Sequence, residues 1–180
     1  DYAKSRPGAL NAGSGGSGGP SHLALELFNR RAGTDIVHVP YRGSAPALQD
    51  LATGRIQMMI DSYNIMRPMV EAGQVKLLAI TSDARRPILP DLPTTAEAGL
   101  PDFVVYGWQG LVTRTGTPPE IVGKLEKAME AALQEPEVQQ ALAAQGADVR
   151  FRNAADFAAF MRAERERWGG VIRDAGITLN

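Results

Sequence analysis

The chain has 180 residues, of which 44% are hydrophobic and 22% are charged, a balance that is typical of a globular protein and excludes a disordered one. Its 19 basic and 20 acidic side chains give a net charge of −1, and neither half of the chain is enriched in one sign. Because basic patches hold nucleic acids and anionic membranes, we expect neither partner. The chain has no cysteine, which excludes disulfides and cysteine metal sites.

Predicted helices and strands alternate along the chain. Residues 1–8 are typical of a helix end, and a short strand at 10–12 precedes a glycine-rich stretch at 13–19. Short apolar or β-branched runs predict further strands at 36–39, 56–60, 75–80, 103–111 and 149–151. Apolar periodicity and glycine stops predict helices at 20–31, 45–53, 63–71, 118–134, 136–146 and 154–175, with Thr117 and Asn153 as caps. This alternation predicts an α/β fold, a mainly parallel sheet flanked by helices.

The glycine-rich stretch is the first candidate site. Gly13, Gly15 and Gly18 satisfy the pattern G-x-G-x-x-G, and Asp35 follows about twenty residues later, so a dinucleotide-binding oxidoreductase domain is one interpretation. In that fold the acidic residue ends the second strand, whereas Asp35 begins it. With five glycines in seven residues, the pattern also arises easily by chance.

A more general interpretation is an anion-binding loop. Small residues let backbone N–H groups approach a ligand, and the helix that starts at Pro20 adds unpaired donors and the positive end of its dipole. Ser14, Ser17 and Ser21 add hydroxyl groups, so the loop could hold a carboxylate or phosphate. A flexible turn that needs only small residues explains the same stretch equally well.

A second loop also joins the end of a strand to the start of a helix. It contains Gly43, Ser44 and Ala45, whose N–H groups could face the same crevice, although Ser44 could simply be a helix cap. Asp61 ends the next strand, where it could bind a water or an ammonium group, or cap the following helix. Two strand-end loops that offer N–H groups are stronger evidence for a site than either loop alone.

Catalytic motifs are missing. The two histidines, His22 and His38, lie in a predicted helix turn and a predicted strand, and no metalloprotease, nucleophile-elbow or P-loop pattern occurs. No spacing supports a catalytic pair such as Ser14 with His22. We therefore expect two structural histidines and no enzyme.

Several segments together resemble the Bug (TctC-like) solute receptors of tripartite tricarboxylate transporters. The resemblance covers nearly the whole chain in the right order. It rests on the glycine-serine loop with SHLA at 21–24, HVPYRG at 38–43 with APA at 45–47, LAITS at 78–82 with two arginines at 85–86, LPDLPT at 89–94 with EAG at 97–99, and Gly-Thr-Pro at 116–118.

The resemblance implies a periplasmic binding protein whose two α/β lobes close over a small organic anion. The anion would be a mono-, di- or tricarboxylate or an amino acid, delivered to membrane transporter components without a cofactor or metal. In the family, main-chain N–H groups and small hydroxyl residues hold the ligand carboxylate. The matching positions are Gly13, Ser14, Ser17, Gly18, Ser21, Gly43, Ser44, Ala45 and Asp61. One departure is Gly18-Gly19-Pro20, where family members more often carry small polar residues.

The resemblance also implies a domain division. Residues 9–105 would be the second lobe, which carries the binding loops, and residues 106–180 would return to a first lobe. Similar proteins begin with a signal peptide and a substantial further part of the first lobe, neither of which is seen here, so we expect a fragment. Apolar faces at 106–111 and on the last helix would then favour association of copies of the chain.

Overall fold

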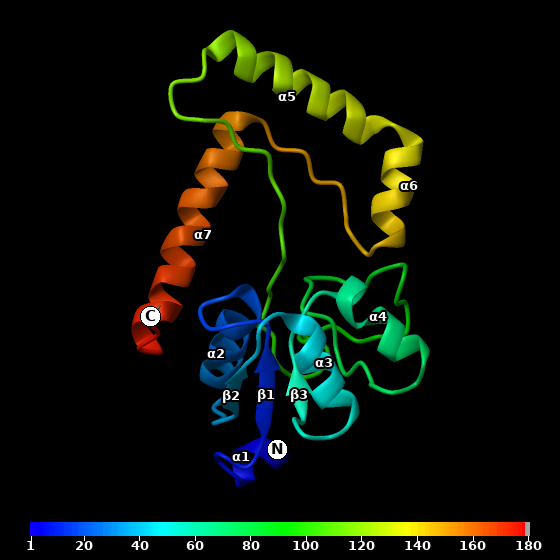
Figure 1. The fold of residues 1–180 in the computed structure, drawn as a ribbon, viewed down its shortest axis with the longest axis vertical. Coiled ribbons are helices and arrows are strands. Elements are labelled where there is room, and N and C mark those ends of the chain that lie inside the picture. Colours follow the sequence, from blue (N-terminus) through cyan, green and yellow to red (C-terminus); the bar gives the residue numbers. More distant parts are fainter. Residues whose placement is uncertain (179–180) are drawn as a thin grey trace. The chain divides into compact units, whose positions relative to one another are not determined.

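A computed structural model describes residues 1–178 (Figure 1). The chain divides into two compact units. The first unit contains residues 1–107 and the described residues from 168 onward, and the second contains residues 108–167. The predicted lobe boundaries at 9–105 and 106–180 remain a proposal.

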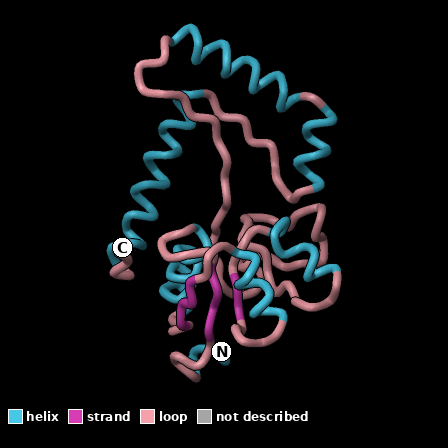
Figure 2. Tube along the Cα trace, viewed as in Figure 1, coloured by secondary structure: helices cyan, strands magenta, loops and turns pink. Residues whose placement is uncertain are grey.

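A three-stranded parallel sheet forms the centre of the first unit (Figures 1 and 2). Its strands are β1 (Asn11–Ser14), β2 (Val37–Pro40) and β3 (Met58–Met59), in the order β2-β1-β3. On the central strand, Ala12 pairs with His38 on one side and with Met58 on the other. The predicted α/β class with a parallel sheet is confirmed.

Two helices cover opposite faces of this sheet. These are α2 (Pro20–Ala32) and α3 (Ser44–Ala52). Leu25 of α2 packs on Ala12, whereas a Cβ on Gly13 would lie 3.2 Å from the Cβ of Ala47 in α3. Since neighbouring residues of a strand face opposite sides, the two helices lie on opposite faces. The short α1 (Tyr2–Ser5) precedes β1, and α4 (Tyr63–Glu71) follows β3.

A second apolar cluster joins distant segments of the first unit. Phe103, which is 1% exposed, packs with Leu27 of α2 and with Val171 of α7 (Ala154–Asp174), and its ring meets Phe28 edge-on at 5.5 Å between centroids. Arg30 and Asp174 form an ion pair beside this cluster. The last turns of α7 are therefore held on α2 by apolar burial.

The second unit contains α5 (Pro119–Gln134), α6 (Pro136–Ala144) and the first part of α7. Neither α5 nor α6 has a buried residue. Its aromatic contacts centre on Trp108, whose ring meets Phe157 and Phe160 of α7 edge-on at 5.5 and 5.6 Å. As predicted, Asn153 caps α7, because its side-chain oxygen accepts the N–H of Asp156 at 2.8 Å.

Several predicted strands are wrong. The segments 75–80, 103–111 and 149–151 form no ladder; Ile80 makes one isolated bridge to Thr94, and Leu78 is 70% exposed. The first strand begins one residue later than predicted and extends through Ser14, and β3 has two residues rather than five. Apolar runs indicate burial, but a ladder also needs a neighbouring strand in register. None of the helices in the described part of the chain has the length and apolarity needed to cross a membrane.

Candidate anion-binding site at the carboxyl edge of the sheet

The carboxyl ends of the three strands bring together the loops selected from the sequence. The loop at 15–19 follows β1, the loop at 41–43 follows β2, and Asp61 follows β3. The sheet order reverses at β1, because α2 leads to one neighbouring strand and α3 leads to the other. Ligands of open α/β sheets bind at such a switch point, outside the carboxyl ends of the strands.

The glycine loop uses most of its N–H groups internally. The N–H of Gly15 donates to Ser21 Oγ at 3.2 Å, that of Gly16 to Ser14 Oγ at 3.2 Å, and that of Gly18 to His22 Nδ1 at 2.9 Å. This differs from the expected cradle of free glycine amides. Among the described residues, the amides of Ser17 and Ser21 have no acceptor, and Ser17 is exposed.

The second loop packs directly on the first. The N–H of Gly43 donates to the carbonyl of Gly15 at 3.0 Å, and a Cβ on Gly15 would lie 3.0 Å from Ser44 Oγ. Ser44 and Ala45 open α3, where no preceding turn supplies carbonyl acceptors. Within the described residues their amides have no acceptor. Four free donors therefore lie on the two loops in contact and the helix starts that follow them, at positions 17, 21, 44 and 45.

Asp61 lies beside the start of α3. Its carboxylate accepts the Ser44 hydroxyl at 2.6 Å and the N–H of Ser62 at 2.8 Å. The only proton of the Ser44 hydroxyl is thus directed at Asp61, which leaves the Ser44 oxygen as an acceptor. The structure therefore joins a group of N–H donors to a carboxylate-hydroxyl pair.

Gly13 and Ser14 belong to β1 itself. Gly13 is buried against Ile56 and Tyr41, and Ser14 is 0% exposed. The Ser14 hydroxyl lies 2.6 Å from His38 Nε2 and 3.1 Å from the carbonyl oxygen of Gly16. These two residues end the strand that leads into the loop, and the Ser14 hydroxyl bonds to Gly16 of the loop. Their direct contact with a ligand stays a prediction.

The two histidines form a stacked pair beneath the loop. Their ring centroids are 3.6 Å apart and the ring planes differ by 8°. His22 Nε2 lies 3.4 Å from a carboxylate oxygen of Glu26. Burial, together with the neighbouring His22, lowers the pKa of His38 to about 4, so His38 is neutral at pH 7. No sequence spacing supported a pair of Ser14 with His22, and in the structure the histidine beside the Ser14 hydroxyl is His38.

The dinucleotide interpretation is not supported. Asp35 precedes β2, so it lies at the amino edge of the sheet, where its carbonyl accepts the N–H of Gly8 at 2.7 Å. The glycine loop lies at the carboxyl edge. An acidic residue at the far edge of the sheet could not contact the ribose of a dinucleotide bound at the loop.

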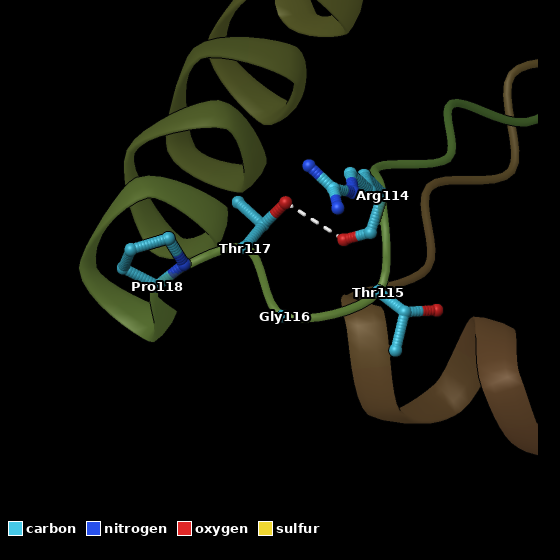
Figure 3. A pocket seen from close by; sticks show the side chains of 5 residues that line it. All are labelled: Arg114, Thr115, Gly116, Thr117 and Pro118. Atoms are coloured by element: carbon cyan, nitrogen blue, oxygen red, sulfur yellow. Dashed lines mark hydrogen bonds between the residues drawn. The ribbon is translucent and has the colours of Figure 1, made fainter.

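The second unit contains a separate hollow of about 460 Å³ at the turn before α5. It is lined by residues 114–118, and Figure 3 shows the Thr117 hydroxyl directed at the carbonyl of Arg114, to which it donates at 2.8 Å. The predicted capping of α5 by Thr117 is therefore wrong, because that hydroxyl is engaged in the preceding turn. Among the described residues, no group of three histidine or acidic side chains is arranged to bind a metal.

Comparison with known proteins identifies the family. The model of the tripartite tricarboxylate transporter family receptor, TctC, matches residues 1–177, and the chain belongs to this family. It is 40% identical over 179 residues to a protein of the tcbD-tcbE intergenic region of Pseudomonas sp. strain P51, covering 99% of this chain but 53% of that relative. A shorter relative, from the clcB-clcD intergenic region of Pseudomonas knackmussii, is 41% identical, with 87% of this chain and 94% of the relative covered.

Solved structures have the same fold. A Rhodopseudomonas palustris protein solved with adipate superposes with a TM-score of 0.88 at 39% identity, covering 98% of this chain and 59% of that one. MatC from Rhodopseudomonas palustris, with bound malate, gives a TM-score of 0.82 at 37% identity, covering 95% of this chain and 59% of that one. This chain thus spans about three fifths of each of these two structures.

Proposed function

We propose that the chain supplies the carboxylate-binding loops of a periplasmic receptor that captures a small organic anion for a tripartite tricarboxylate transporter. Family membership and the relatives solved with adipate and malate support the ligand class. The receptor acts without a cofactor and without catalysis.

The observation that carries this proposal is the convergence of free N–H donors on two loops in contact. The amide of Ser17 lies in the loop before α2, that of Ser21 in the first turn of α2, and those of Ser44 and Ala45 at the start of α3. Each helix start adds the positive end of its dipole. Such a site binds a carboxylate without a basic side chain.

The carboxylate of Asp61 defines the other chemical feature of the ligand. Because Asp61 and the Ser44 oxygen are acceptors, we propose that the ligand places a hydroxyl or ammonium group beside them. A hydroxy acid or an amino acid meets this requirement while its carboxylate occupies the N–H donors. A carboxylate ligand without a hydroxyl or ammonium group would leave Asp61 hydrogen-bonded to water instead of to the ligand.

Two further parts of the proposal concern assembly. We propose that residues 9–105 act as one lobe of the receptor and that residues 106–180 return to the other. The exposed apolar side chains of Leu111 and Val112, 70% and 75% exposed, would then be covered by a further part of the receptor or by a second copy of the chain.

Ligand-dependent thermal stabilisation tests the function. The chain is heated with mono-, di- and tricarboxylates, hydroxy acids, amino acids, NAD and NADP. A ligand at one hundred times its dissociation constant adds about 2.7 kcal/mol to the free energy of unfolding, which shifts the transition clearly. Stabilisation by carboxylates supports the proposal. Stabilisation by a nucleotide alone, or by none of the compounds, contradicts it.

A charge substitution locates the site. Ser17→Asp places an anion among the donors and should weaken binding of a stabilising carboxylate by about tenfold or more. Ser17→Asn has nearly the same size without the charge and should bind nearly as the parent does. Since Ser17 is exposed, both variants should keep the parent's unfolding temperature without ligand. Equal binding by the two variants would place the site elsewhere.

A further inference from the structure

The stacked histidines lie where they can control the shape of the glycine loop. His22 accepts the N–H of Gly18 at 2.9 Å, and His38 lies 2.6 Å from the hydroxyl of Ser14. The same hydroxyl contacts both the N–H and the carbonyl of Gly16. Each ring therefore fixes one part of the loop, and the 3.6 Å stack fixes the rings relative to each other.

The hydrogen bond from Gly18 determines which nitrogen of His22 carries the proton. Nδ1 accepts an N–H, so it has no proton, and the neutral ring carries its proton on Nε2, which lies 3.4 Å from Glu26. A second proton on His22 would have to go to Nδ1. It would then oppose the N–H of Gly18, and the bond that holds the loop would break.

Protonation of His38 acts on the same arrangement. A charged His38 would lie face to face with His22 and would meet no acid of its own, because the titratable groups in contact with the two rings are each other and Glu26 on α2. The contact from β1 is the uncharged Ser14 hydroxyl. A charge on His38 is therefore unfavourable beside His22, and a charge on His22 removes the acceptor of the Gly18 N–H.

We propose that His22 and His38 are positioning residues for anion binding, and that protonation of this stacked pair releases the glycine loop and weakens carboxylate binding in acid. The proposal rests on the proposed function for its second half. Its first half, the coupling of the loop to the histidines, concerns the ligand-free chain.

Variants that keep the hydrogen bonds but do not titrate test the idea. In His38→Gln the side-chain amide reaches Ser14 from the position of Nε2, and in His22→Asn the side-chain oxygen stands near the position of Nδ1 and accepts the N–H of Gly18. His22→Leu removes this acceptor at every pH. At pH 7.5 we expect His22→Leu to bind adipate about tenfold more weakly than the parent and His22→Asn to restore most of the loss.

The pH profile separates this role from a merely structural one. Adipate itself gains protons in acid, so the quantity to compare is the ratio of the parent's dissociation constant to that of His38→Gln or His22→Asn at each pH. We expect this ratio to rise severalfold between pH 7.5 and pH 3.5, because the pKa of His38 in the folded chain is about 4. A ratio that stays constant for both variants overturns the proposal.

Nuclear magnetic resonance of the labelled chain tests the first half without ligand. The amide resonances of Gly16 and Gly18 should shift with the same midpoints as the histidine rings, and the shift of Gly18 should vanish in His22→Asn. If adipate and malate bind at no pH, the proposed function fails, and these resonances alone decide the positioning role. Glycine amides that do not respond to histidine titration overturn it.

Discussion

Gly13 lies on the central strand at a point where a single methyl group should be costly. Its φ angle is not in the left-handed region, so alanine would meet no backbone strain. A Cβ there would instead overlap Ile56 Cδ1 and lie 3.2 Å from Ala47 Cβ and 3.3 Å from Tyr41 Cε2. Because Ile56 is 3% exposed, its side chain has little room to move. We expect Gly13→Ala to lower the free energy of unfolding by about 1–3 kcal/mol.

A second substitution makes the argument quantitative. Ile56→Val removes the overlapping Cδ1 atom and should cost about 0.5–1.5 kcal/mol by itself. In the double variant the new methyl group occupies part of the vacated space, so the combined loss should be smaller than the sum of the single losses by about 1 kcal/mol. The control is Gly170→Ala in the same unit, where a Cβ has no neighbour within 4 Å in the interior of α7. It should stabilise the chain by about 0.5–1 kcal/mol.

Urea unfolding followed by tryptophan fluorescence measures these differences. A Trp108→Phe background leaves Trp168 as the only tryptophan, and this residue belongs to the same unit as Gly13. Additivity of Gly13→Ala and Ile56→Val within about 0.5 kcal/mol would show that the methyl group does not meet Ile56. The reasoning from packing would then be refuted.

Three further predictions concern other parts of the chain. Phe103→Ala should destabilise the first unit by about 3–5 kcal/mol in urea unfolding, because the ring is 1% exposed. The control Leu78→Ala changes a side chain that is 70% exposed and should alter stability by less than about 0.5 kcal/mol. Similar losses in both variants would contradict the assigned core. Asn153→Ala should cost about 1 kcal/mol and reduce helical circular dichroism, whereas Asn153→Asp should retain both; no loss in the alanine variant would exclude the cap. Because folding lowers the pKa of His38 from 6.5 to about 4, the unfolded state binds more protons in that range, and stability should fall as the pH drops through it. The full pKa shift corresponds to about 3 kcal/mol of unfolding free energy, and solvent screening of the partly exposed ring should reduce the measured loss to about half of that. In acid unfolding curves, His38→Gln should abolish this loss of stability.

The local signals along the chain were sufficient for the helices. The helix predicted at 63–71 matches α4 at both ends, and the predicted glycine stop of α2 is Gly33, which has a φ of +63°. Caps, prolines and left-handed glycines act within one turn, so short windows of sequence contain them. The parallel α/β arrangement followed from the alternation of these helices with short apolar runs.

Strand pairing needed information from distant residues. The run at 75–80 is as apolar as a buried strand, yet Ile80 bridges only Thr94, and Thr81 bonds to Val105 at two points without forming a ladder. A strand exists only where a second segment presents its own N–H and C=O groups in register. No local pattern contains that register, so the apolar runs were assigned to more strands than the sheet has.

The candidate site shows the same division. Residue type and order were enough to select two N–H-rich loops and Asp61, because glycine, serine and helix starts have the same chemistry wherever they occur. The partners of those groups were set by packing. Three glycine amides bond to Ser14, Ser21 and His22, and the Ser44 hydroxyl bonds to Asp61. His38 contacts Ser14 from the neighbouring strand. A hydrogen bond requires two atoms within about 3 Å, and only the folded chain brings residues separated by 17 or 24 positions to that distance.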